Sequence, residues 1–142
     1  MTKSLKVRGC RWIDVPGASD ARGSVNFLEF GQALDFQPKR IFWLHHVAPG
    51  QWRGRHGHRE SKLVFVALNG HCQLHLDDGT VTQTVRLDDP ARALYMAPWV
   101  WHELTDFAQD TAVLVIASSL YENAEYLRDY DEFKDEVKGR VT

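Results

Sequence analysis

Cysteine is scarce in this sequence of 142 residues: there are two, Cys10 and Cys72, and neither belongs to a C-x-x-C pair. Two isolated cysteines exclude the disulfide framework that holds many small secreted domains together. Long hydrophobic runs are also lacking, because the longest, residues 63–68 and 112–117, have the length of a strand and fall far short of a membrane span. Residues 1–15 contain no apolar run of signal-peptide length. We therefore expect a cytoplasmic protein with no membrane partner.

An excess of charge of one sign is lacking too, since 17 Lys and Arg stand against 19 Asp and Glu, with a formal net charge of −2. Such a balance offers no broad basic surface, so we expect no nucleic-acid partner. A composition that is 44% hydrophobic and 25% charged excludes intrinsic disorder. With no internal repeat and no Gly/Ser linker, residues 1–142 are expected to form a single domain.

Short β-like segments dominate the chain up to about residue 120. Turn signals such as Pro49-Gly50, Asn69-Gly70 and Asp78-Gly79 separate them. The segments predicted as strands are 11–15, 24–30, 40–47, 63–68, 72–76, 81–87, 93–96 and 111–118. After residue 121, apolar side chains recur at steps of three and four residues from Tyr126 to Val137, which predicts one or two short helices. The pattern is typical of an all-β jelly-roll or small barrel with a helical C-terminal segment.

The segment from Gly50 to His58, with the sequence GQWRGRHGH, carries the first candidate site. In a strand, His56 and His58 project from the same face because they are two residues apart. The pKa of a free imidazole lies near 6.5, so this pair suits either general acid–base chemistry or metal binding. The alternative is one core histidine and one surface histidine. Together with the later Gly70, the segment resembles the first sequence motif of cupins.

A third histidine, His102, follows Ala97-Pro98 where the second cupin motif ends, so we expect it to join the pair across the fold. Metal-binding cupins place a glutamate after the second histidine with three or four residues between them, and at those positions this chain has Lys62 and Leu63. Glu60 is a poor substitute for this glutamate. It lies only two residues after His58, on the same face of the strand. A metal site made of three histidines therefore stays an alternative.

Several basic residues are candidates to hold a phosphate or diphosphate, because a guanidinium offers planar, bidentate donors. They are Arg22, Lys39, Arg40, Arg53, Arg55 and Arg92. For each of them the alternative is ordinary surface charge. The tryptophans and Phe42 are more often part of a core than a platform on which a base or sugar stacks.

Several short motifs also occur together in a distinctive order between residues 20 and 133. They are Arg22-Gly-Ser with Glu29, Phe36 before Lys39-Arg40, Arg53-Gly-Arg-His56-Gly-His58, Leu76-Asp-Asp-Gly79, Leu94-Tyr-Met-Ala-Pro98 with Trp101, Asp106-Phe107, and Tyr121-Glu122 before Tyr126-Leu-Arg-Asp-Tyr-Asp-Glu-Phe133. In this order and spacing the chain resembles the dTDP-sugar 3,4-ketoisomerases of the cupin superfamily, a family that is also found as a domain of bifunctional WxcM-like proteins.

The resemblance implies a cupin-type jelly-roll β-barrel that forms a homodimer and works without a metal or organic cofactor. The implied reaction converts dTDP-4-keto-6-deoxy-D-glucose into a dTDP-3-keto-6-deoxyhexose through an enediolate, with both gluco and galacto products open. His56 and His58 match the family's paired catalytic histidines, and we favour His58 as the base and His56 as the proton shuttle. Arg22 and Arg40 match its anion-binding arginines.

Three positions depart from the family pattern. Phe42-Trp43 replaces a pair of tyrosines, Leu63 replaces a glutamine, and His102 replaces an arginine. We expect His102 to bind the substrate as a donor to the enediolate or the diphosphate. Two alternatives stay open: a non-catalytic protein that binds a nucleotide sugar, and a metal-dependent cupin in which His56, His58 and His102 hold one divalent transition metal.

Overall fold

The computed structural model describes residues 2–32 and 34–140, and these residues form thirteen strands, one 3₁₀ turn and one α-helix. In chain order they are β1 (Thr2–Ser4), β2 (Cys10–Asp14), β3 (Gly17–Asp20), β4 (Gly23–Asn26), β5 (Arg40–His45), β6 (Arg53–His58), β7 (Leu63–Asn69), β8 (Cys72–Asp77), β9 (Thr82–Leu87), β10 (Arg92–Met96), β11 (Trp101–Thr105), β12 (Ala112–Ala117), η1 (Asn123–Glu125), β13 (Tyr126–Leu127) and α1 (Tyr130–Arg140).

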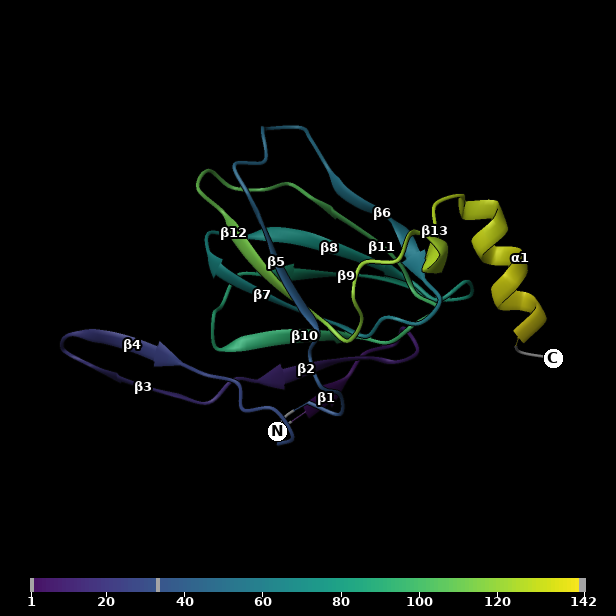
Figure 1. The fold of residues 1–142 in the computed structure, drawn as a ribbon. Coiled ribbons are helices and arrows are strands. Elements are labelled where there is room, and N and C mark those ends of the chain that lie inside the picture. The colour runs from purple at the N-terminus through teal and green to yellow at the C-terminus, as the bar shows by residue number, and fades with distance from the viewer. Residues whose placement is uncertain (1, 33, 141–142) are drawn as a thin grey trace.

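Two antiparallel sheets face each other, in the manner of a jelly roll. One has the strand order β1-β2-β10-β7-β12-β5 and the other the order β13-β6-β11-β8-β9. The all-β jelly-roll prediction is confirmed, although the two sheets of the described chain are not closed into a continuous barrel. The hairpin of β3 and β4 forms a separate two-stranded sheet, which projects away from the two main sheets (Figure 1).

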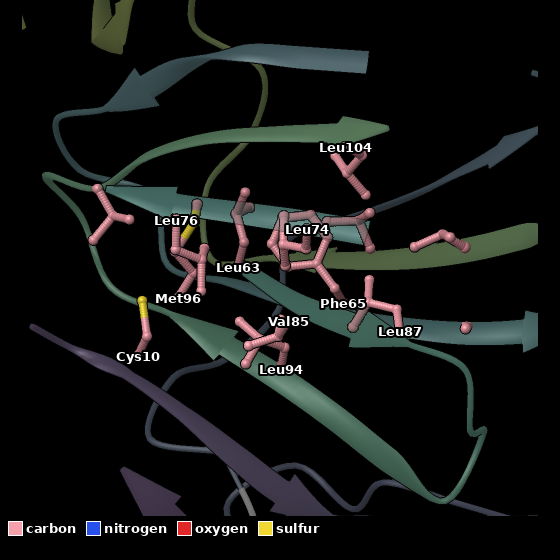
Figure 2. Packing of buried hydrophobic residues seen from close by; sticks show 14 of the residues in the cluster. Cys10, Leu63, Phe65, Leu74, Leu76, Val85, Leu87, Leu94, Met96 and Leu104 are labelled. Atoms are coloured by element: carbon pink, nitrogen blue, oxygen red, sulfur yellow. The ribbon is translucent and has the colours of Figure 1, made fainter. Parts of the chain in front are cut away.

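The main core lies between the two sheets. Alternation on β8 turns Cys72, Leu74 and Leu76 inward, as the period-two pattern predicts. They pack with Leu63 and Phe65 of β7, and these side chains gather between the strands in Figure 2. This core holds β6 and β11, which carry the histidines, on a well-packed scaffold.

The outer side of the six-stranded sheet is also apolar. Residues such as Val64 and Val66 of β7 and Ile116 of β12 pack there with Leu34, so residues 63–67 of β7 are buried on both faces. Beyond them lies a group of hydrophobic side chains, which we call the outer apolar face. It consists of Phe27, Phe30, Ile41, Leu68 and Leu114, and it borders a cavity of about 390 Å³.

The strand predictions are confirmed with small shifts at their ends, except for one strand. The predicted start of the C-terminal helix is also wrong. The predicted strand 24–30 ends at Asn26, because β4 pairs only with β3 in the projecting hairpin. Tyr126 and Leu127 do not begin the helix. They pair with the edge of β6 as β13, and α1 begins at Tyr130. Within the described residues, no helix is both long enough and apolar enough to cross a membrane.

Candidate active site

Three imidazoles from two neighbouring strands form one cluster. His56 on β6 lies directly opposite His102 on β11, and His58 follows on the same face of β6. The His56 ring centroid lies 4.9 Å from that of His58 and 4.7 Å from that of His102. Burial differs among them, since His58 and His102 are almost fully enclosed, with 1% and 3% of their surface exposed, while His56 is only partly buried. The predicted convergence of the three histidines is therefore confirmed.

An irregularity in β6 makes room for this cluster. The register between β6 and β11 shifts between His102 and Glu103, and Gly54 and Arg55 adopt left-handed φ angles of 88° and 61°. A Cβ atom on Gly54 would lie 3.1 Å from the backbone oxygen of His102 and 3.2 Å from its ring. Glycine at this position thus allows His102 to pack against the bulged strand.

A buried carboxylate that the sequence analysis missed contacts His58. Glu125 Oε2 lies 2.6 Å from His58 Nδ1, while Glu125 Oε1 accepts hydrogen bonds from the backbone N–H groups of Glu60 and Ser61. Glu125 lies 67 residues after His58, and the sequence motifs did not single it out. The expected metal-ligand positions, Lys62 and Leu63, gave no indication of it.

A phenol also reaches the cluster, although the family's paired tyrosines are replaced by Phe42-Trp43. Tyr126 of β13 pairs with His58, and its ring centroid lies 4.8 Å from that of His56 and 4.6 Å from that of His58. Its hydroxyl lies 3.4 Å from Arg40 Nη2. The spacing of apolar residues predicted a helix at Tyr126, and no motif marked this residue as part of the site.

The two predicted arginines have different positions. Arg40, at the start of β5, contacts the hydroxyl of Tyr126, and its guanidinium lies over the rings of Phe42 and Tyr121. Arg22 lies in the turn of the β3–β4 hairpin, where its side chain is 90% exposed and pairs with Asp20. Within one copy of the chain, Arg22 makes no described contact with the histidines.

The departures from the family pattern at Phe42, Trp43 and Leu63 have simple structural settings. Leu63 is buried in the main core and Phe42 packs against that core. Trp43 alternates with Phe42 on β5 and is 58% exposed. These three side chains therefore add no polar group to the cluster.

Burial keeps two of the imidazoles, those of His56 and His102, uncharged. Desolvation, reinforced by the neighbouring His58, lowers the pKa of His56 to about 4. Desolvation likewise places the pKa of His102 well below that of a free imidazole, with further lowering by the other two rings. For Glu125, burial alone would raise the pKa, but the hydrogen bonds from His58 and from two backbone N–H groups lower it to about 2. At neutral pH the site therefore combines the neutral imidazoles of His56 and His102 with the carboxylate of Glu125.

Comparison with known proteins agrees with this geometry. The family described as FdtA, WxcM-like, C-terminal, matches residues 8–138. A TDP-4-oxo-6-deoxy-alpha-D-glucose-3,4-oxoisomerase from Aneurinibacillus thermoaerophilus is 41% identical over 115 residues, which cover 81% of this chain and 83% of the relative.

Solved structures give the same result. QdtA, a sugar 3,4-ketoisomerase from Thermoanaerobacterium thermosaccharolyticum in complex with TDP, has a TM-score of 0.92 at 30% identity, covering 95% of this chain and 98% of QdtA. A histidine-to-asparagine variant of QdtA, in complex with TDP-4-keto-6-deoxyglucose, also has a TM-score of 0.92 at 30% identity, covering 94% and 97% of the two chains. The chain therefore belongs to the FdtA, or WxcM-like C-terminal, family of sugar-nucleotide 3,4-ketoisomerases.

Proposed function

We propose that the protein is an isomerase that converts dTDP-4-keto-6-deoxy-D-glucose into a dTDP-3-keto-6-deoxyhexose. The observation that carries this proposal is the cluster of three histidines beside a phenol and an arginine, in a chain 41% identical to a 3,4-oxoisomerase of that sugar nucleotide. The cluster provides what the reaction requires: a base for a carbon-bound proton, a shuttle between two oxygens and donors for a developing oxyanion.

The reaction moves two protons and no net electrons. The C4 ketone acidifies the proton on C3, so a base removes it and the electron pair forms an enediolate with the negative charge on O4. A proton then moves from O3 to O4, and C4 accepts a proton as the C3 ketone forms. The product has the same composition as the substrate, with the ketone and hydroxyl exchanged.

Burial favours His56 as the base, which reverses the assignment that we favoured from the sequence. His56 is the only partly exposed imidazole of the three, so a sugar entering the site meets it first. With a pKa of about 4 it is neutral at physiological pH, as a base must be. His58 lies behind it and is suited to shuttle the proton between O3 and O4 together with Tyr126.

Donors near the histidines fit the negative charges of the substrate. Arg40 and the hydroxyl of Tyr126 lie together, and buried Arg40 Nε has no hydrogen-bond partner among the described residues. Buried Nδ1 of His102 is likewise unpartnered within that part of the chain. We assign Arg40 to the diphosphate or the enediolate oxygen and His102 to the enediolate.

Arg22 takes part in this scheme if the protein is a homodimer. The outer apolar face is extensively exposed, with Phe30 at 56%, Ile41 at 54% and Leu68 at 50%, and a patch of this kind is typical of a subunit interface. The β3–β4 hairpin projects from the two main sheets (Figure 1), and β4 leads directly into Phe27 of this face. We propose that a second copy covers the outer apolar face, and that the hairpin of each copy carries Arg22 to the diphosphate in the partner's site.

A divalent metal is the second candidate for this site, because His56, His58 and His102 offer nitrogens within 4.8 Å of one another. The donor set suits a transition metal such as Zn²⁺. We favour a reaction without a cofactor, because Arg40 beside the cluster favours an anion, and the carboxylate of Glu125 is already held by His58 and two backbone N–H groups.

Incubation with dTDP-4-keto-6-deoxyglucose in D₂O tests the proposal. The wild-type protein, prepared without a His-tag column and treated with a chelator, should form the 3-keto product and incorporate deuterium into the sugar ring. His56→Asn should lower the rate by a factor on the order of 10²–10⁴. His75→Asn is the matched control, because His75 binds two threonines on β9 and β11 outside the cluster.

Each alternative has its own outcome in this experiment. Binding of the sugar nucleotide without deuterium incorporation would identify a non-catalytic binding protein. Loss of activity on chelation, restored by one near-stoichiometric transition metal, would identify a metal-dependent enzyme. Full activity in His56→Asn would show that another group removes the proton.

A further inference from the structure

Glu125 is a buried carboxylate to which the proposed reaction has assigned no role. It is 5% exposed, and its two oxygens have separate partners. Oε2 lies 2.6 Å from Nδ1 of His58, whereas Oε1 lies 3.1 Å from the backbone nitrogen of Glu60 and 2.9 Å from that of Ser61. Two backbone donors on one oxygen hold the carboxyl plane in a single orientation, so the other oxygen stays directed at the imidazole.

This arrangement defines where the proton of His58 lies. A backbone N–H can only donate, so Oε1 must accept from both Glu60 and Ser61. An ionised carboxylate has no proton to give, so Oε2 must also accept, and the donor of the 2.6 Å hydrogen bond is Nδ1–H of His58. The lowered pKa of Glu125, about 2, agrees with an ionised group.

The other nitrogen of the same ring then carries the lone pair. Nε2 of His58 is buried and has no hydrogen-bond partner among the residues that the structure describes. It lies on the side of the ring away from Glu125, and the rings of His56 and Tyr126 are the neighbours of His58, with centroids 4.9 Å and 4.6 Å away. An unpartnered basic nitrogen inside the cluster is suited to accept a proton from a sugar hydroxyl.

We infer that Glu125 is a positioning residue, which keeps the His58 proton on Nδ1 so that Nε2 can receive and return the proton that moves between O3 and O4. The inference rests on the proposed ketoisomerase reaction and adds to it the group that makes His58 competent. When Nε2 accepts the O3 proton, His58 becomes an imidazolium, and the adjacent carboxylate stabilises that charge. When the proton passes to O4, the ring returns to its starting tautomer.

Glu125→Gln separates this role from a structural one. The amide oxygen must face Glu60 and Ser61, because an amide NH₂ there would meet two further donors. The NH₂ group then faces His58 and donates to Nδ1, which moves the ring proton to Nε2. The variant thus keeps the hydrogen bonds to the backbone and reverses the tautomer of one catalytic histidine. Glu122→Gln is the matched control, because Glu122 is an exposed glutamate three residues earlier.

Two readouts are needed. The first is a long-range ¹H–¹⁵N correlation spectrum of protein labelled with ¹⁵N-histidine. The wild type and Glu122→Gln should show the Nδ1–H form of His58, and Glu125→Gln should show the Nε2–H form. In the D₂O assay, kcat of Glu125→Gln should fall by a factor on the order of 10²–10⁴, with KM changed less than about threefold. Glu122→Gln should behave as the wild type does.

Failure of the inference can be told apart from failure of the proposed function. A wild type that incorporates no deuterium and forms no 3-keto sugar would overturn the ketoisomerase reaction itself. An active wild type in which His58 carries its proton on Nε2 would overturn the inference alone, even if Glu125→Gln does not fold. A folded Glu125→Gln variant with unchanged kcat would do the same.

Discussion

Burial in the interior cluster disfavours protonation of His56 and His102, and the neighbouring imidazoles add to that effect. The pKa of His56 is about 4, lowered by desolvation and by the neighbouring His58, and the pKa of His102 lies well below that of a free imidazole. Neutrality of these rings has a catalytic use, because a protonated imidazole cannot remove a proton from carbon. The neutrality of these rings also makes stability depend on pH, because in the unfolded chain the same histidines have an ordinary imidazole pKa.

We predict that the folded protein loses stability as the pH falls from 6.5 to 5. In this range the unfolded chain binds protons at His56 and His102, whereas the folded chain does not, so protonation favours unfolding. The stabilising contribution is complete above the unfolded pKa near 6.5 and is lost as the pH falls toward the folded value, which is about 4 for His56. The expected loss is on the order of 2 kcal/mol for His56, and His102 adds to it in the same direction.

Urea unfolding at several pH values measures this loss. Between pH 6.5 and 5 the stability change comes from the histidines and not from Glu125. The pKa of Glu125 is lowered from 4.5 to about 2 in the folded protein, so its contribution to stability is lost only below about pH 4.5. In His56→Asn the dependence on pH should become shallower. A free energy of unfolding that stays constant between pH 7 and pH 5 would contradict the prediction.

At the scale of elements, the bulge in β6 couples backbone shape to the position of His102. We predict that Gly54→Ala destabilises the protein by about 1–2 kcal/mol and lowers activity, because alanine at a φ of 88° is strained and its Cβ would press on His102 at 3.1–3.2 Å. Thermal unfolding measures the first effect and the D₂O assay measures the second.

Gly50→Ala is the matched control for that substitution. Gly50 has a similar φ of 79°, but nothing lies within 4 Å of the position that its Cβ would take. The control should therefore share the loss of stability caused by backbone strain and keep its activity. Equal activity in both variants would show that the contact with His102 has no influence on the site.

The elements also explain which parts of the site could be predicted from the sequence. The spacing of His56 and His58 predicts their shared face, because a strand repeats every two residues. Tyr126 reaches the histidines through β13, which is only two residues long and lies far along the chain, and Glu125 directly precedes it at the end of η1. Such a short strand leaves no alternating pattern. Buried Leu127, with Phe133 and Val137, instead gave the spacing of a helix, so tertiary pairing decided the structure.

At the scale of the whole molecule, the position of Arg22 on the projecting hairpin allows a direct test of the proposed dimer. If Arg22 serves the partner's site, a mixed dimer of one Arg22→Ala subunit and one His56→Asn subunit has one complete site. The His56 of the first subunit then works with the Arg22 of the second. Each variant alone should have little activity, and co-expression should restore about a quarter of the wild-type value if the subunits pair at random.

Light scattering on the same samples reports the assembly. We expect a dimer in the wild type, whereas Ile41→Glu should yield monomers, because it places a charge on the outer apolar face. No recovery of activity in verified mixed dimers would show that Arg22 does not act across the interface. A wild-type particle with the chain mass of 16.3 kDa at micromolar concentration would contradict the dimer itself.

The short strand β13 has a further consequence, for the temperature at which the enzyme stops working. It carries Tyr126 and directly follows Glu125, yet it pairs with β6 over two residues only, supported by Leu127 and by hydrogen bonds from Arg59 to the carbonyl oxygens of Ala124 and Tyr126. Local opening of so small a unit costs less than unfolding the sheets. On warming, catalysis should therefore cease reversibly while the sandwich of sheets is still intact.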